Sequence, residues 1–123
     1  MGQNVCDCPY PPGGRVVCSD DQLAICTIEN GVAVGQCLEP PSDLTQWALS
    51  NGASRTDYLR GAWFREGDLL IRWAYSAITG TKPELSSGPV SPGVRSMLTA
   101  GLFEKDPFTK VTFTLPDQIR EEL

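Results

Sequence analysis

All five cysteines of this chain lie within its first 37 residues, and the other 86 residues contain none. They are Cys6, Cys8, Cys18, Cys26 and Cys37. Thiols confined to less than a third of a chain indicate a local cross-link, through either a metal ion or disulfide bonds. The amino-terminal part is therefore expected to be held together by its cysteines.

The cysteine-rich part has the sequence pattern of antiparallel strands. Residues 15–18 are rich in β-branched side chains, and residues 22–29 alternate between two faces. Asn30-Gly31 then gives a strong signal for a two-residue hairpin turn before a return strand over 32–38. The pattern predicts a three-stranded antiparallel β-meander over about residues 14–38.

The register of the hairpin places two of the thiols. A two-residue turn at Asn30-Gly31 sets Cys26 opposite Gly35 and Cys37 opposite Ala24. Side chains alternate with period two, so Cys26 and Cys37 are predicted to share one sheet face, with small neighbours that leave room above it. Cys18 joins that face only if the turn that follows it, at Ser19-Asp20-Asp21, has three residues.

The leading hypothesis for the thiols is a structural zinc site. In an extended segment Cys6 and Cys8 point the same way, and they could bind one ion together with Cys26 and Cys37. Cys18 is a possible substitute ligand. Four thiolates form the soft tetrahedral set that zinc prefers, although copper(I) or an iron–sulfur cluster also accepts thiolates.

Two other interpretations of the thiols stay open. Disulfide bonds across neighbouring strands are sterically reasonable and would indicate an exported protein. Cysteines that simply pack as small buried hydrophobic side chains are the third interpretation. The cysteine count is odd, and the sequence does not open with a charged segment followed by an apolar one, as a secretory signal does. Both observations favour a cytoplasmic location, with export as the alternative if a signal was removed.

The rest of the chain is predicted to be mainly helical. Helices are expected over 42–50, over 54–79 with a kink or break at Gly67-Asp68, and over 91–101 after a Ser91 cap and Pro92. Residues 110–115 alternate like an edge-compatible strand, and a short helix follows over 118–123. Trp63 and other apolar residues of the middle stretch are predicted to be core.

The expected fold is α+β. A cysteine-rich three-stranded antiparallel β-meander, residues 1–41, would pack on a helical body, residues 42–123, that ends in a strand and a short helix. A chain of 123 residues also fits one single compact domain.

Charge is distributed unevenly along the chain. Residues 1–43 carry six acidic residues and one arginine, whereas residues 44–123 carry nine acids and nine bases. The acidic part would repel polyanions, so nucleic-acid binding is not expected there. The longest apolar run is far shorter than the ~20 residues needed to span a bilayer, so no membrane association is expected.

Catalysis is not expected. The chain has no histidine, which removes the commonest general base and the usual partner of a nucleophilic serine or cysteine. It contains neither a P-loop nor a G-x-G-x-x-G sequence.

Two segments resemble a known family. Residues 110–123, KVTFTLPDQIREEL, resemble the strand and first helix of ribbon-helix-helix DNA-binding proteins. Residues 52–60, GASRTDYLR, resemble the start of that family's second helix, but here they precede the strand. The resemblance implies a DNA-binding regulator.

These observations predict a small non-enzymatic module that binds zinc and another protein. The first alternative is an exported protein stabilised by disulfide bonds, and the second is a DNA-binding regulator.

Overall fold

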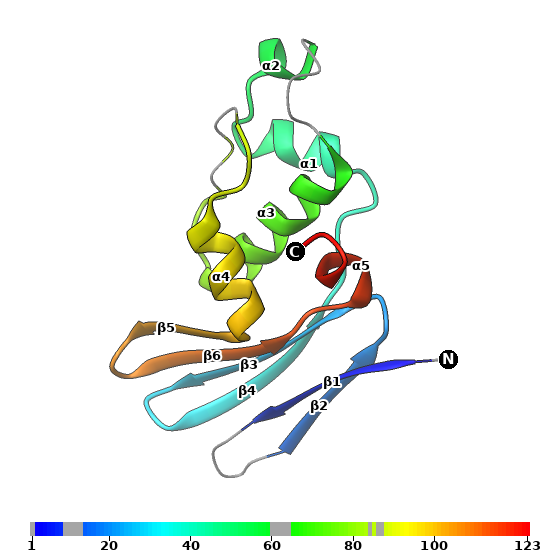
Figure 1. Cartoon of the computed structure of the whole chain (residues 1–123). Coiled ribbons are helices and arrows are strands. Elements are labelled where there is room, and N and C mark those ends of the chain that lie inside the picture. The colour runs from blue at the N-terminus through cyan, green and yellow to red at the C-terminus, as the bar shows by residue number, and fades with distance from the viewer. Residues whose placement is uncertain (1, 9–13, 60–64, 84, 86–87) are drawn as a thin grey trace.

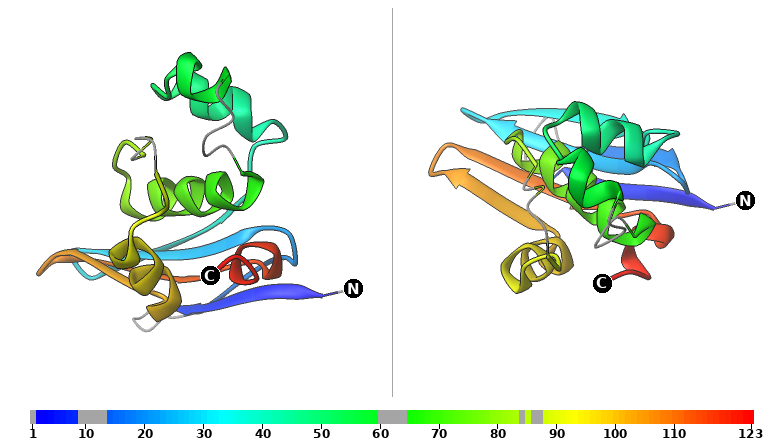
Figure 2. Two further views of the ribbon diagram at one scale, coloured as in Figure 1. Left: turned by 45° about the horizontal axis from the view of Figure 1, so that its top comes forward. Right: turned by 90° about the horizontal axis from the view of Figure 1, so that it is seen from above.

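The computed structural model describes residues 2–8, 14–59, 65–83, 85 and 88–123. In this part of the chain helices cover one face of a four-stranded antiparallel sheet, and a two-stranded sheet covers the other face (Figures 1 and 2). The strands are β1 (Gln3–Cys8), β2 (Gly14–Ser19), β3 (Leu23–Glu29), β4 (Val32–Leu38), β5 (Leu102–Asp106) and β6 (Thr109–Thr114). The helices are α1 (Leu44–Ser50), α2 (Arg55–Leu59), α3 (Glu66–Thr79), α4 (Pro92–Ala100) and α5 (Asp117–Arg120).

The predicted α+β class is confirmed, but the three-stranded meander is wrong. β2 pairs with β1 in the two-stranded sheet and not with β3, while the larger sheet has the order β4-β3-β6-β5. The turn between Ser19 and Gln22 therefore carries the chain from one sheet to the other. The place beside β3 that the meander assigned to β2 is taken by β6.

The hairpin of β3 and β4 has the predicted register. Asn30 and Gly31 both have positive φ, 52° and 80°, as a type I′ turn requires. Cys26 lies opposite Gly35 and Ala24 opposite Cys37. Local turn chemistry thus determines this part of the fold.

The two faces of β3 and β6 have different coverings. Leu23, Ile25, Val111 and Phe113 face the helices and belong to the main core with Leu69, Ile71, Trp73, Leu98 and Ile119, among others. The opposite face of β3 carries Ala24, Cys26 and Ile28, which pack against Cys6 and Cys18 of the two-stranded sheet. The room predicted above the small residues is thus filled by β1 and β2.

α1 and α4 both begin at a side-chain cap, and the Ser91 cap of α4 was predicted. The Asp43 carboxylate accepts a hydrogen bond from the Gln46 amide at the start of α1 (3.0 Å), and the Ser91 hydroxyl accepts one from the Val94 amide at the start of α4 (3.3 Å). Gly101 ends α4 with φ 72°.

The middle helical stretch consists of the separate helices α2 and α3. Gly67 and Asp68 lie in the first turn of α3 and not at a break. Residues 60–64, including the predicted core position Trp63, lie outside the described residues.

The carboxy-terminal strand has a different place from the expected one. β6 pairs with β3 on one side and with β5 on the other, so it is an interior strand and not an edge strand. The four-stranded sheet therefore takes strands from both sides of the predicted boundary at residue 41. β5 was not predicted, because Leu102–Asp106 carries three charged residues and no alternating apolar pattern.

Candidate functional site

Four of the five cysteines form two disulfide bonds between the sheets. Cys8 of β1 is bonded to Cys26 of β3, and Cys18 of β2 is bonded to Cys37 of β4. The Cα atoms are 5.6 Å apart in each pair, a normal distance for a disulfide. Each strand of the two-stranded sheet is thus joined covalently to a different strand of the larger sheet.

The predicted zinc site is wrong. The proposed ligands Cys8, Cys26 and Cys37, and the substitute Cys18, are consumed in disulfides, whose sulfur atoms are not the thiolates that zinc requires. Among the described residues no group of three or more cysteine, histidine or carboxylate side chains could hold a metal ion. The prediction that Cys26 and Cys37 share a face is confirmed, but the face bears two covalent cross-links.

Cys6 is the remaining thiol, and it is buried. Its side chain is 4% exposed and packs between the sheets with Cys18, Ala24, Cys26 and Ile28. The Cys6 Sγ lies 3.7 Å from the Thr112 Oγ1 of β6, a weak hydrogen bond. The thiol therefore acts as a small core side chain, the third interpretation considered for the cysteines.

A buried asparagine fixes β1 to the larger sheet beside these bonds. Asn4 is 5% exposed, and its Nδ2 donates to the carbonyl oxygens of Gln22 and Thr114, both at 2.7 Å. The Thr114 hydroxyl in turn donates to the Val5 carbonyl oxygen at 2.8 Å. Nothing in the sequence pattern distinguishes Asn4 from a surface residue, so these contacts depend on the tertiary arrangement.

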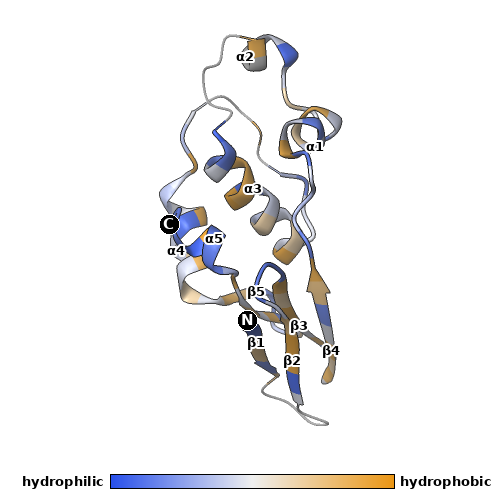
Figure 3. Cartoon of the chain, turned by 90° about the vertical axis from the view of Figure 1, so that its right-hand side faces the viewer, coloured by the Kyte–Doolittle hydropathy of each residue, from blue (hydrophilic) through white to orange (hydrophobic). Residues whose placement is uncertain are grey.

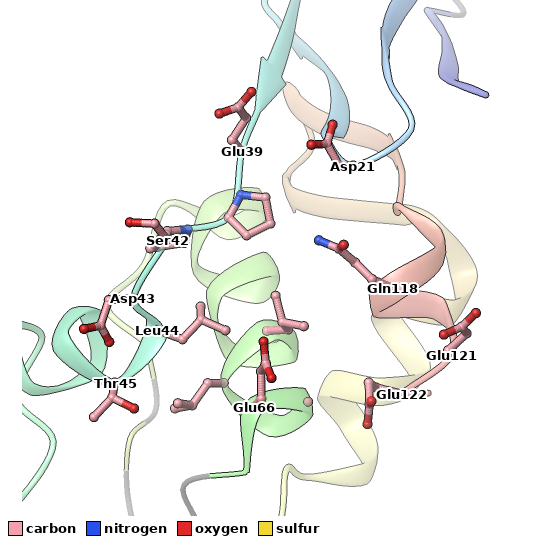
Figure 4. A pocket seen from close by; sticks show the side chains of 15 residues that line it. Asp21, Glu39, Ser42, Asp43, Leu44, Thr45, Glu66, Gln118, Glu121 and Glu122 are labelled. Carbon is pink, nitrogen blue, oxygen red and sulfur yellow. The ribbon is translucent and has the colours of Figure 1, made fainter. Parts of the chain in front are cut away.

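One hollow on the described surface is acidic. It has a volume of about 730 Å³ and lies between the segment that joins β4 to α1, the start of α3, and α5 (Figure 4). Its acidic residues are Asp21, Glu39, Asp43, Glu66, Glu121 and Glu122. No lysine or arginine is among the 15 lining residues, so the negative charge is not compensated within the lining.

Several of these carboxylates also have structural roles. Asp43 caps α1, and the Glu39 carboxylate accepts a hydrogen bond from the Gln22 side chain at 3.2 Å. Glu66 lies in the first turn of α3, where the helix dipole stabilises negative charge. The Glu122 carboxylate lies over Gly67 of the same turn, so close that a Cβ there would be 2.1 Å from it.

A buried carboxylate of α3, next in the chain to the lining residue Gly67, anchors the carboxy-terminal turn. Asp68 is 5% exposed and accepts hydrogen bonds from the Arg65 guanidinium at 3.1 and 3.2 Å. Arg95 of α4 lies 3.5 Å from the same carboxylate and also donates to the Glu122 carbonyl oxygen at 2.6 Å. The hydrogen bond to Asp68 and its negative charge raise the pKa of Arg65 above the usual value.

The sequence indicated only part of this hollow. The excess of acids in residues 1–43 includes Asp21, Glu39 and Asp43, but Glu66, Glu121 and Glu122 come from the electroneutral remainder. Figure 4 shows side chains of α5 and of the β4–α1 connection on opposite sides of α3. Segments so far apart in the chain meet only through the tertiary fold.

No protein-family model matches this chain. No curated protein and no solved structure is significantly similar to it. No helix in the described part of the chain is both long and apolar enough to cross a membrane.

Proposed function

We propose that this chain is an exported, disulfide-stabilised small protein that acts by binding another protein and not by catalysis. The observation that carries this proposal is the pair of disulfides between the two sheets. Disulfides form and persist in oxidising compartments and are rare in the cytosol. The expected cytoplasmic location is therefore not supported.

The layer between the sheets explains why cross-links are useful here. Its buried residues are Cys6, Cys18, Ala24, Cys26 and Ile28, which are mostly small side chains. Burial of so little apolar surface gives little stabilisation at about 25 cal/mol per Å². Closing loops of 18 and 19 residues adds about 3 kcal/mol per disulfide in the chain-entropy model.

A partner with a basic segment fits the acidic hollow. The lining carries six carboxylates and no lysine or arginine, and all six acidic residues are exposed. Complementary charge across an interface steers association and selects partners. The same surface would repel the phosphates of nucleic acids, so a DNA-binding regulator is the less favoured role.

The disulfide part of the proposal is tested by thiol counting. Protein exported to an oxidising compartment should have an intact mass lower than the fully reduced chain by four hydrogens, two for each bond. Alkylation should modify no thiol in the native protein and one thiol, Cys6, in denaturant. Five alkylated thiols in the exported protein would contradict the proposal.

The binding part is tested with synthetic peptides. A lysine-rich peptide should bind the oxidised protein, and binding should weaken as salt screens the charges, whereas a glutamate-rich peptide of equal length should not bind. Glu66→Gln with Glu121→Gln should reduce the affinity several-fold. Glu29→Gln with Glu104→Gln is the matched control, because it removes two exposed carboxylates outside the hollow. Equal binding of the two peptides would exclude the acidic hollow as a binding site for a basic segment.

A further inference from the structure

The two edges of the four-stranded sheet differ in how they are protected. The edge strand β5 carries Glu104, Lys105 and Asp106 and has a register shift between Glu104 and Asp106. Charges and bulges are devices that keep a sheet edge from pairing with another strand. The other edge strand, β4, has no charged residue among its seven and pairs with β3 in an unbroken register.

The backbone of β4 leaves a regular row of hydrogen-bonding groups unpaired by any strand of the described structure. The two-residue turn makes Glu29 and Val32 a hydrogen-bonded pair, so bonding to β3 alternates from Val32 onward. Ala33, Gly35 and Cys37 consequently direct their N–H and C=O groups away from β3. In the described part of the chain β3 is the one strand that is hydrogen-bonded to β4, which lies at an edge of the four-stranded sheet. Figure 3 shows β4 from this side of the molecule.

Exposed apolar side chains accompany this open edge. Val32 is 61% exposed and Val34 is 51% exposed. Both side chains lie on the face of the sheet that carries the helices, at positions that the helices leave uncovered. A free edge strand that is apolar and uncharged is a template for another strand. The acidic hollow is a separate surface, because none of its lining residues belongs to β4.

We propose that β4 pairs antiparallel with β4 of a second copy of this chain, which joins two four-stranded sheets into one. A two-fold axis at Gly35 would set Ala33 opposite the partner's Cys37 and Gly35 opposite the partner's Gly35, each pair exchanging two hydrogen bonds. Val34 then lies opposite the partner's Gln36 and Val32 opposite the partner's Leu38.

The charge pattern favours a second copy as the occupant. A strand without charges matches an equally uncharged strand, and this register opposes no two like charges. A charged strand of a different protein would find no complementary charge along β4. The row of donors and acceptors at Ala33, Gly35 and Cys37 is also symmetric about Gly35, as an isologous interface requires.

The proposal is tested by measuring the mass of the oxidised full chain by sedimentation equilibrium. Physiological salt is used because it screens the repulsion between two chains of net charge −5. We expect twice the chain mass of 13.4 kDa. Val34→Lys should give the monomer mass. Ala33→Pro should do the same, because it removes an outward N–H and leaves the bonds to β3 intact.

Leu102→Lys on β5 is the matched control. Leu102 is 48% exposed on the protected edge, and its replacement should leave the dimer unchanged. Hydrogen exchange should show concentration-dependent protection of the amides of Ala33, Gly35 and Cys37. A monomeric wild-type chain at all concentrations, or a Val34→Lys chain that remains dimeric, would overturn the proposal.

Discussion

At the scale of single residues, Gly35 determines how closely the two sheets approach. A Cβ built on Gly35 would lie 2.5 Å from the Val16 Cγ2 of β2, which is well inside van der Waals contact. The glycine is therefore needed for space and not for an unusual φ, since Gly35 is not among the residues with positive φ. Close packing here brings Cys18 within bonding distance of Cys37.

Gly35→Ala should consequently destabilise the oxidised protein by about 1–3 kcal/mol, the usual cost of overpacking a tight contact. Urea unfolding followed by circular dichroism would measure the free energy of unfolding. Gly14→Ala is the control, because nothing lies within 4 Å of a Cβ at Gly14 of β2. Equal effects of the two substitutions would mean that β2 does not pack on β4 as described.

At the scale of elements, the two disulfides differ in how accessible they are. Cys37 is exposed on the edge strand β4, whereas Cys26 lies in the sheet interior with 0% exposure and its partner Cys8 is half-buried. Thiol–disulfide exchange needs access of the attacking thiolate to a sulfur atom. The bond between β2 and β4 is therefore the more vulnerable one.

Limited reduction should break Cys18–Cys37 well before Cys8–Cys26. Trapping with an alkylating reagent and peptide mapping by mass spectrometry would identify the modified cysteines. We expect early modification of Cys18 and Cys37 with Cys8 and Cys26 still bonded. Simultaneous loss of both bonds would show that reduction follows global unfolding and not local access.

At the scale of the whole molecule, the four-stranded sheet joins the two ends of the chain. β3, from the cysteine-rich part, pairs along Ala24 to Glu29 with β6, which begins at Thr109. The helix-facing side chains of β3, Leu23 and Ile25, are buried in the core that α3 and α4 complete. The amino-terminal strands thus depend on residues about 85 positions further along.

A fragment of residues 1–41 should therefore not fold alone, even with both disulfides formed. It would lack β6 beside β3 and the helical layer over Leu23 and Ile25. The amide resonances of the isotope-labelled fragment should be poorly dispersed, in contrast to those of the full chain. A well-dispersed spectrum would establish residues 1–41 as an independent domain.

The sequence by itself determined what depends on neighbours along the chain. The Asn30-Gly31 turn, the register of β3 with β4, the Ser91 cap of α4 and its end at Gly101 were all predicted. Each depends on positive φ or on a side chain that bonds a nearby amide, so the information is contained within a few residues.

Only the tertiary structure decided which distant segments meet. The sequence could not show that β1 and β2 form their own sheet, that β6 lies beside β3, or that Cys8 bonds to Cys26. Strand pairing uses the same backbone groups in every strand, and thiols suit metal ions and disulfides equally. The choice depends on which apolar faces cover one another, and here the small face of β3 is covered by β1 and β2.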